Sequence, residues 1–215
     1  MRFALFDLDG TLVDRSAAFA DAVASLVHDH AYGPEIEQCL LTELADRADR
    51  SDFDRLRTTF FLNESADQLW RSYVDRMAAS VHCRPAVLTA LQKLKQVGWI
   101  LGIATNGASD IQRAKLDASG ISDLIDGIAV SGDIDVRKPD RRLFELAAAR
   151  CGLSLADGGW MIGDNPATDI GGGRQVGLST IWVRGRPWPD ALFTADHTVD
   201  DVTDAIDLLL TTTSE

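Results

Sequence analysis

The chain has 215 residues, enough for one well-buried domain and a smaller accessory one. Its hydrophobic fraction of 46% and charged fraction of 25% are ordinary for a globular protein and exclude a disordered or fibrous chain. The net charge of −12 argues against nucleic acid polymers as partners, because an acidic surface repels a phosphate backbone. The negative net charge does not exclude small phosphorylated metabolites as substrates, since a bound divalent cation can reverse the local charge of a pocket.

The three cysteines, Cys39, Cys83 and Cys151, are far apart and odd in number, which fits neither a disulfide framework nor a zinc site. The first ten residues, MRFALFDLDG, contain an apolar run that is too short and too acidic for a signal peptide. No stretch approaches the roughly 20 apolar residues of a membrane-spanning helix. We therefore expect a cytoplasmic protein without a membrane partner, either a monomer or a homodimer.

The N-terminal part of the chain predicts one strand followed by helices. Residues 3–8 (FALFDL) indicate a short buried strand that runs into an acidic turn. Residues 16–82 show only helical periodicity; Pro34 suits the first position of a helix, and Ser65 with Gln68 forms a capping box. The sequence thus predicts a small all-helical domain of four helices, inserted at 16–82.

The rest of the chain alternates between helices and strands. We expect helices at about 85–97, 109–118, 140–150, 169 onwards and 201–210, and strands at 99–104, 127–131, 160–163 and 179–183. This alternation predicts an α/β fold, a Rossmann-like doubly wound parallel sheet with helices on both faces, built from residues 1–15 and 83–215. Ligands of such sheets bind at the carboxyl ends of the strands.

The first strand ends in two closely spaced carboxylates. Asp7 and Asp9 are two residues apart on an extended segment, so both can face one pocket. Their mutual repulsion is relieved if a divalent cation binds between them. Gly10 allows the backbone to approach a ligand closely. The alternative is an acidic turn without a binding role.

Polar residues also follow the second and third strands. Thr105 and Asn106 precede a helix and could hold phosphoryl oxygens at its N-terminus, although capping residues of an ordinary turn look the same. Lys138 is followed by Pro139, which suits a first helical position. A lysine at this place could neutralise both carboxylates and a phosphate, although Lys-Pro pairs are also common in surface loops.

The fourth strand leads into Gly163-Asp164-Asn165-Pro166-Ala167-Thr168-Asp169. Asp164 supplies the hard oxygen ligand that Mg²⁺ prefers, and Asp169 is a candidate both for the metal site and for a helix N-cap. Glycines 171–173 would let this helix pack closely. Further on, Trp182 is expected in the core and Trp188 near the rim of the pocket.

Together the segments FDLDGTLVD, ATNG, RKPD and GDNPATD, in this order and spacing, resemble the four motifs of the haloacid dehalogenase superfamily. The resemblance covers the whole chain. It implies a Rossmann-like core with a helical cap inserted after the first motif, at 16–82. It also implies a magnesium-dependent phosphatase that hydrolyses small phosphorylated metabolites through an aspartyl-phosphate.

By the same resemblance, each motif residue has an expected role. Asp7 is the nucleophile, and Asp9 is the general acid and then the general base. Mg²⁺ is held by the Asp7 side chain, the Asp9 backbone carbonyl and Asp164, with Asp169 nearby or acting through water. The phosphoryl group is held and neutralised by Thr105, Asn106 and Lys138, with Gly10 beside it.

Three other functions can be weighed against this one. Family members that release halide generally lack an aspartate two positions after the nucleophile, so Asp9 favours a phosphatase. A phosphomutase of the β-phosphoglucomutase type stays open, because its motifs are the same. A non-catalytic phosphate-binding module on the same fold is the alternative outside enzymes. The physiological substrate is not readable from the motifs, since they handle only the phosphoryl unit.

Overall fold

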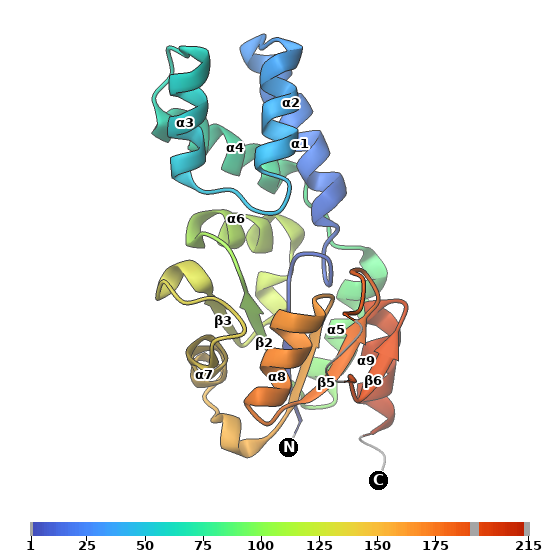
Figure 1. Cartoon of the computed structure of the whole chain (residues 1–215). Coiled ribbons are helices and arrows are strands. Elements are labelled where there is room, and N and C mark those ends of the chain that lie inside the picture. The colour runs from blue at the N-terminus through green and yellow to red at the C-terminus, as the bar shows by residue number, and fades with distance from the viewer. Residues whose placement is uncertain (1, 190–193, 213–215) are drawn as a thin grey trace. The chain divides into compact units, whose positions relative to one another are not determined.

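The computed structural model describes residues 2–189 and 194–212, and the chain forms two compact units (Figure 1). The first unit consists of Met1–Val13, Cys83–Asn106 and Gly120–Glu215, and the second of Asp14–His82 and Gly107–Ser119. Sequence patterns predict residues 107–119 as part of the Rossmann-like unit. The structure instead groups this segment with the helices of the insert.

A parallel sheet is the centre of the first unit, as predicted. Among the described residues it has six strands in the order β3-β2-β1-β4-β5-β6. The strands are β1 Phe3–Phe6, β2 Ile100–Thr105, β3 Gly127–Val130, β4 Trp160–Gly163, β5 Ser179–Val183 and β6 His197–Val199. In this order β1 and β4 are central neighbours, with Phe6 opposite Ile162. The order in which the chain adds strands to the sheet reverses between β1 and β4. Folds of this kind bind ligands at such a switch point.

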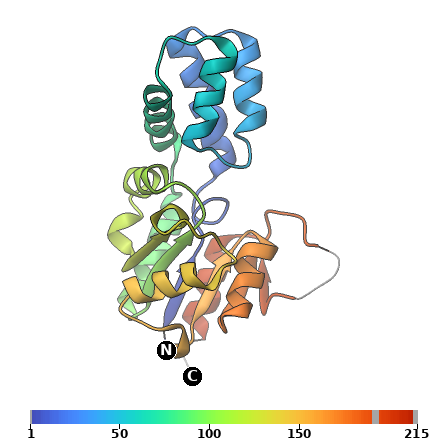
Figure 2. The ribbon, with the colours of Figure 1, turned by 60° about the vertical axis from the view of Figure 1, so that its left-hand side comes forward.

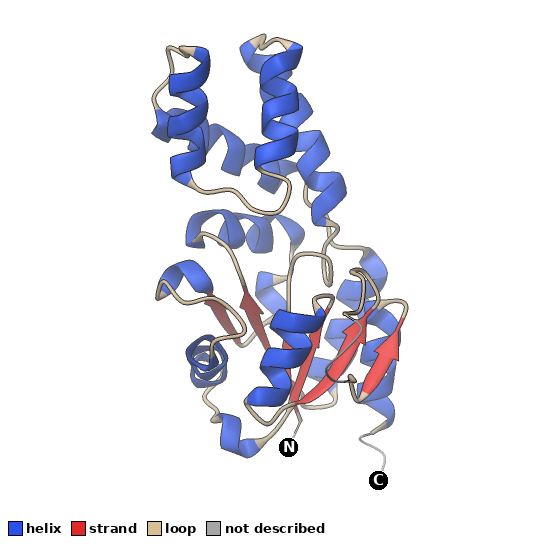
Figure 3. Ribbon diagram, in the orientation of Figure 1, coloured by secondary structure: helices blue, strands red, loops and turns tan. Residues whose placement is uncertain are grey.

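Helices cover both faces of this sheet (Figure 3). Helices α7 (Arg141–Arg150) and α8 (Gly172–Gln175) lie on one face, and α5 (Pro85–Gln96) and α9 (Val202–Thr211) lie on the other. All four residues of β1 are buried, as expected for a central strand covered on both sides. The core on the α7 face includes Phe3, Leu5, Leu143, Phe144, Ala147 and Met161.

The predicted elements differ from the structure in three places. Strand β6 was not predicted, because three residues at a sheet edge, two of them exposed, carry too weak a pattern. The helix expected from Asp169 begins earlier, as a π-helical turn over Pro166–Gly171 capped by Asn165, so the N-cap prediction for Asp169 is wrong. Pro139 is not the first residue of α7, which begins at Arg141 after its N-cap Asp140.

The second unit is entirely helical in its described residues. Its helices are α1 (Arg15–His30), α2 (Pro34–Glu43), α3 (Arg50–Phe60), α4 (Ala66–Ser80) and α6 (Ser109–Ser119). Figure 2 shows α1 to α4 gathered into one bundle. Pro34 opens α2 and Ser65 with Gln68 caps α4, both as predicted. Along the described chain, no helix combines the length and apolar character needed to cross a membrane.

Asp110 links α6 to two other helices of the second unit. It accepts a 2.6 Å hydrogen bond from the Trp70 indole of α4 and a 3.2 Å bond from Arg50 of α3. Trp70 is almost fully buried against Phe53 and Tyr73. A charged acceptor for an indole N–H within such a cluster holds the helices together more specifically than apolar contact alone. This explains why α6 groups with the insert.

Close packing at Gly172 generates a stability prediction. A Cβ at this position would lie 2.8 Å from Phe144 Cζ and 3.1 Å from Pro139 Cα. We expect Gly172→Ala to lower the free energy of unfolding by about 1–3 kcal/mol through overpacking, measured by urea denaturation. Gly33→Ala is the control: the space around Gly33 is open, and its cost should stay below about 1 kcal/mol. Equal stability of the two variants would contradict this account.

Candidate active site

The two central strands each deliver an aspartate to the same edge of the sheet. Asp7 directly follows β1, and its backbone N–H donates to Ile162 O of β4 at 2.9 Å. Asp164 directly follows β4. Because β1 and β4 are paired and parallel, their carboxyl ends lie side by side at the point where the strand order reverses. The backbone pairing of β1 and β4 therefore fixes the positions of both aspartates.

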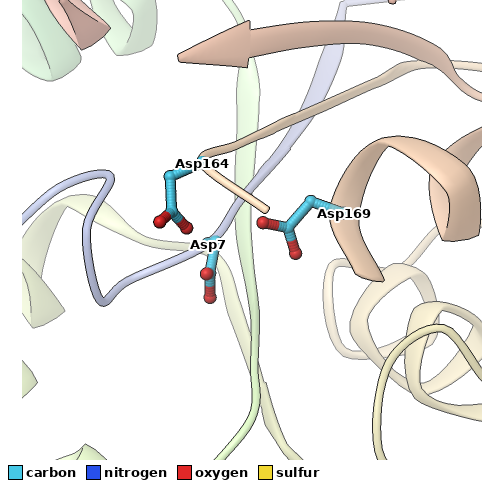
Figure 4. Close-up of side chains that lie close together, drawn as sticks. All are labelled: Asp7, Asp164 and Asp169. Carbon is cyan, nitrogen blue, oxygen red and sulfur yellow. The ribbon is translucent and has the colours of Figure 1, made fainter. Parts of the chain in front are cut away.

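Three buried carboxylates converge at this place: Asp7, Asp164 and Asp169 (Figure 4). One carboxylate oxygen from each lies within 4.8 Å of the other two. Such a cluster of like charges is unfavourable unless cations compensate it. Three hard oxygen donors so close together fit Mg²⁺, which prefers carboxylate and water oxygens in octahedral geometry. The three carboxylates are therefore chemically suited to bind magnesium.

Lys138 supplies positive charge inside the cluster. Its Nζ lies 2.8 Å from Asp7 Oδ1 and 2.7 Å from Asp169 Oδ1, and its side chain is 1% exposed. Burial opposes the charge on this lysine, but Asp169 and Asp7 together outweigh it and hold the pKa of Lys138 above its ordinary value. The ammonium group stays charged and bridges the two acids.

Asn106 holds Lys138 in place through the backbone. The Asn106 side-chain oxygen accepts from Lys138 N at 2.8 Å, and its side-chain nitrogen donates to Lys138 O at 3.2 Å. Sequence reasoning expected Asn106 to hold a phosphoryl group. In the structure both ends of its side-chain amide bond the backbone of Lys138, which orients the lysine. Thr105, the last residue of β2, is 1% exposed.

Asp169 is anchored more firmly than the sequence suggested. It is fully buried; its Oδ2 accepts from Asn165 N at 3.0 Å, and its Oδ1 accepts from the Thr168 hydroxyl at 3.3 Å besides facing Lys138. The π-helical turn that contains Asp169 directs the side chain back toward β4, where it lies against Gly163. Its orientation is therefore fixed from both sides.

The turn after Asp7 shapes the other wall of the site. Gly10 has φ of +81°, which a residue with a side chain adopts only with strain. A Cβ there would also lie 2.7 Å from Asp164 Oδ2, so only glycine fits. Asp9 is half-buried; its carboxylate lies outside the group of three, yet its charge contributes to raising the pKa of Asp7.

Burial is the main cause of the shifted pKa values of Asp7 and Asp164. It raises the pKa of Asp7 to about 6, opposed by Lys138 and assisted by Asp169. Burial and Asp7 likewise raise the pKa of Asp164, against the opposing charges of Arg186 and Lys138. A bound cation would oppose this effect of burial and favour the ionised forms of Asp7 and Asp164.

Two residues from β5 and the loop after it also reach the site, and sequence reasoning did not assign them there. Trp182 Nε1 donates to Asp164 O at 2.9 Å, and Arg186 Nε donates to Asp164 Oδ2 at 3.0 Å. Trp182 is half-buried and lies 4.6 Å from the ring of Trp188, so its predicted place in the core is only partly correct. The position of Arg186 just beyond a parallel strand was the available signal.

A family model described as haloacid dehalogenase-like hydrolase matches residues 4–183. The chain belongs to the haloacid dehalogenase-like hydrolase family. The matched range contains β2 to β5, all of β1 except Phe3, and the three aspartates of the cluster described above. The family membership and the Rossmann-like α/β fold inferred from the four motifs are thereby confirmed.

Individual members resemble the chain to different extents. A phosphoserine phosphatase of Thermus thermophilus is 34% identical over 119 residues, which cover 55% of this chain and 47% of that protein. (S)-2-haloacid dehalogenase 4A of Burkholderia cepacia is 26% identical, covering 97% of this chain and 95% of the dehalogenase. A HAD phosphatase from Thermococcus onnurineus has the same fold, with a TM-score of 0.71, 22% identity, and coverage of 97% and 98%. The chain spans about half the length of the curated phosphatases named first among its relatives.

The raised pKa of Asp7 predicts that this residue destabilises the metal-free protein. Its pKa rises from 3.8 to about 6 on folding, so the penalty is absent below about pH 4 and develops as the pH rises to 6. In metal-stripped protein, Asp7→Asn should increase the free energy of unfolding by up to about 3 kcal/mol at pH 7 and by little at pH 4. Denaturation curves across this range test it; a less stable variant at pH 7 would contradict it.

Proposed function

We propose that the protein is a Mg²⁺-dependent phosphomonoester hydrolase that uses Asp7 as nucleophile and passes through an aspartyl-phosphate. The observation that carries this proposal is the buried group of Asp7, Asp164 and Asp169 with Lys138 between two of them. It combines an oxygen nucleophile, a fixed positive charge and a metal-binding donor set in one place. Phosphoryl transfer depends mainly on such positioning and charge neutralisation.

In the first step a carboxylate oxygen of Asp7 attacks phosphorus while the bond from phosphorus to the ester oxygen breaks. Asp9 gives a proton to the departing oxygen. In the second step Asp9 takes a proton from water, the water oxygen attacks the same phosphorus, and Asp7 is released with inorganic phosphate. An ionised carboxylate needs no base to activate it, and Lys138 favours that ionised form.

Asp7 and Asp164 would hold the Mg²⁺ ion, together with the Asp9 backbone carbonyl and with Asp169 beside them. The bound ion would supply positive charge to the phosphoryl oxygens. Lys138 and Thr105 would also hold the phosphoryl group. Gly10 has no side chain, so the backbone there could approach this group closely. Asn106 contributes by orienting Lys138.

Asp9 favours a phosphatase over a dehalogenase. The family contains both activities, as the names of the relatives show. An acid two positions after the nucleophile serves a reaction in which a leaving oxygen must be protonated, whereas a departing halide needs no proton. The half-buried Asp9 carboxylate, electrostatically coupled to Asp7, supports this role.

The substrate is proposed to be a small phosphorylated metabolite. Relatives are named for phosphoserine, pyrimidine 5'-nucleotides and glyceraldehyde 3-phosphate, all small phosphomonoesters. The net charge of −12 argues against a nucleic acid polymer. Cytoplasmic action is part of this proposal, and the three unpaired cysteines are in keeping with a reducing compartment.

The first test is phosphate release from an aryl phosphate. We expect turnover with Mg²⁺, its loss in excess chelator, and little turnover with Ca²⁺, whose looser coordination spoils the alignment of reacting groups. Asp7→Asn should lower kcat on the order of 10⁴-fold or more. Asp123→Asn removes an exposed acid outside the site and serves as the control. Undiminished turnover in chelator would remove the metal from the proposal.

A second variant tests the acid-base role. Asp9→Asn keeps the size of the side chain but cannot exchange a proton, so kcat should fall about 10²–10⁴-fold. The loss should be smaller for aryl phosphates with acidic leaving groups, because these depart without a proton. An equal loss across leaving groups of different pKa would assign Asp9 a different task.

A further inference from the structure

The end of β5 and the loop after it contact Asp164 at three points. Trp182 Nε1 donates to the Asp164 carbonyl, and Arg186 Nε donates to its carboxylate. Between them, Gly185 passes so close that a Cβ would lie 3.3 Å from Asp164 Cβ. This contact surface is formed by residues 182–186, which lie in the same unit as the cluster. These contacts fix the position of Asp164 relative to residues 182–186.

The two cations of the site differ in how freely they can move. Lys138 is 1% exposed and contacts Asp7 and Asp169. Arg186 is 51% exposed and contacts Asp164 through a single nitrogen, Nε. A guanidinium carries four further N–H groups on its terminal nitrogens, arranged to bind phosphate. Lysine is thus a fixed counter-ion, whereas the arginine can leave its partner at little cost in burial.

Metal binding and the Arg186 contact compete for the same carboxylate. Asp164 Oδ2 accepts the Arg186 bond, and Asp164 is also one of the three proposed metal ligands. A divalent cation at Asp164 neutralises the charge that attracts Arg186 and repels the guanidinium. The same cation brings a phosphate dianion to the site, which offers the displaced arginine a new partner.

We propose that Arg186 is a substrate-binding residue that neutralises Asp164 in the metal-free enzyme, is released from it by the divalent cation, and then binds the phosphate group of the substrate. This inference rests on the proposed function. It adds an anion-binding group from the loop after β5 to the four motifs. The tryptophan pair 182 and 188, with ring centroids 4.6 Å apart, flanks the arginine along the chain and would report its movement.

The test compares Arg186→Gln with Arg184→Gln. Arg184 is in the same loop and has the same charge, but it pairs with Asp200 at the surface. Titration calorimetry of the metal-free full chain should show Mg²⁺ binding about fivefold tighter in Arg186→Gln than in wild type, because a competing cation is gone. In Mg²⁺-loaded protein, inorganic phosphate should bind about tenfold more weakly to Arg186→Gln. Arg184→Gln should match wild type in both titrations.

Kinetics and fluorescence separate this role from a structural one. With an aryl phosphate, Arg186→Gln should raise KM about tenfold with little change in kcat, and Arg186→Lys should recover only part of the loss because it keeps the charge without the planar fork. Mg²⁺ should change the tryptophan emission of wild type, and this change should be reduced in Arg186→Gln.

If wild type hydrolyses phosphate esters with Mg²⁺ but Arg186→Gln behaves like Arg184→Gln, or binds Mg²⁺ more weakly than wild type, the role of Arg186 is wrong and the proposed function stands. If wild type binds neither Mg²⁺ nor phosphate and shows no turnover, the proposed function fails, and the role of Arg186 fails with it.

Discussion

Burying several carboxylates in one place is the constraint on which the rest of this structure depends. Asp7, Asp164 and Asp169 lie together where the strand order reverses, and their mutual repulsion must be balanced within the protein. Lys138 balances two of them from a buried position. The surrounding packing keeps that lysine in place: Asn106 clamps its backbone, and Pro139 after it lies close to Gly172.

The site consequently has one rigid side and one adjustable side. On the rigid side, Asp169 is fully buried and bonded to the backbone of its own turn, with Lys138 against it. On the adjustable side, Asp164 faces the half-exposed Arg186. In the proposed reaction, a fixed positive charge would neutralise the phosphoryl oxygens in every turnover, and a movable one would bind a ligand that arrives and departs.

The division of the chain has a consequence for the second motif. Asn106 is the last residue of its segment in the first unit, and Gly107 begins the segment that belongs to the helical unit. Helix α6 is fastened within that helical unit by the bonds of Asp110 to Trp70 and Arg50. The residue that orients Lys138 is therefore covalently adjacent to the helical unit, a link that strand and helix patterns alone do not reveal.

The sequence by itself determined the parallel α/β architecture, the acids and lysine that follow the strands, and local caps such as that of Ser65 with Gln68. These features depend on side-chain periodicity and on groups a few residues apart, which a linear pattern records. Only the tertiary structure decided the partners of Asn106 and Arg186, which lie 32 and 22 residues away along the chain. Strand β6 and the orientation of the Asp169 side chain toward β4 were likewise decided by the tertiary structure. Strand order and packing, not local sequence, determine which distant groups come into contact.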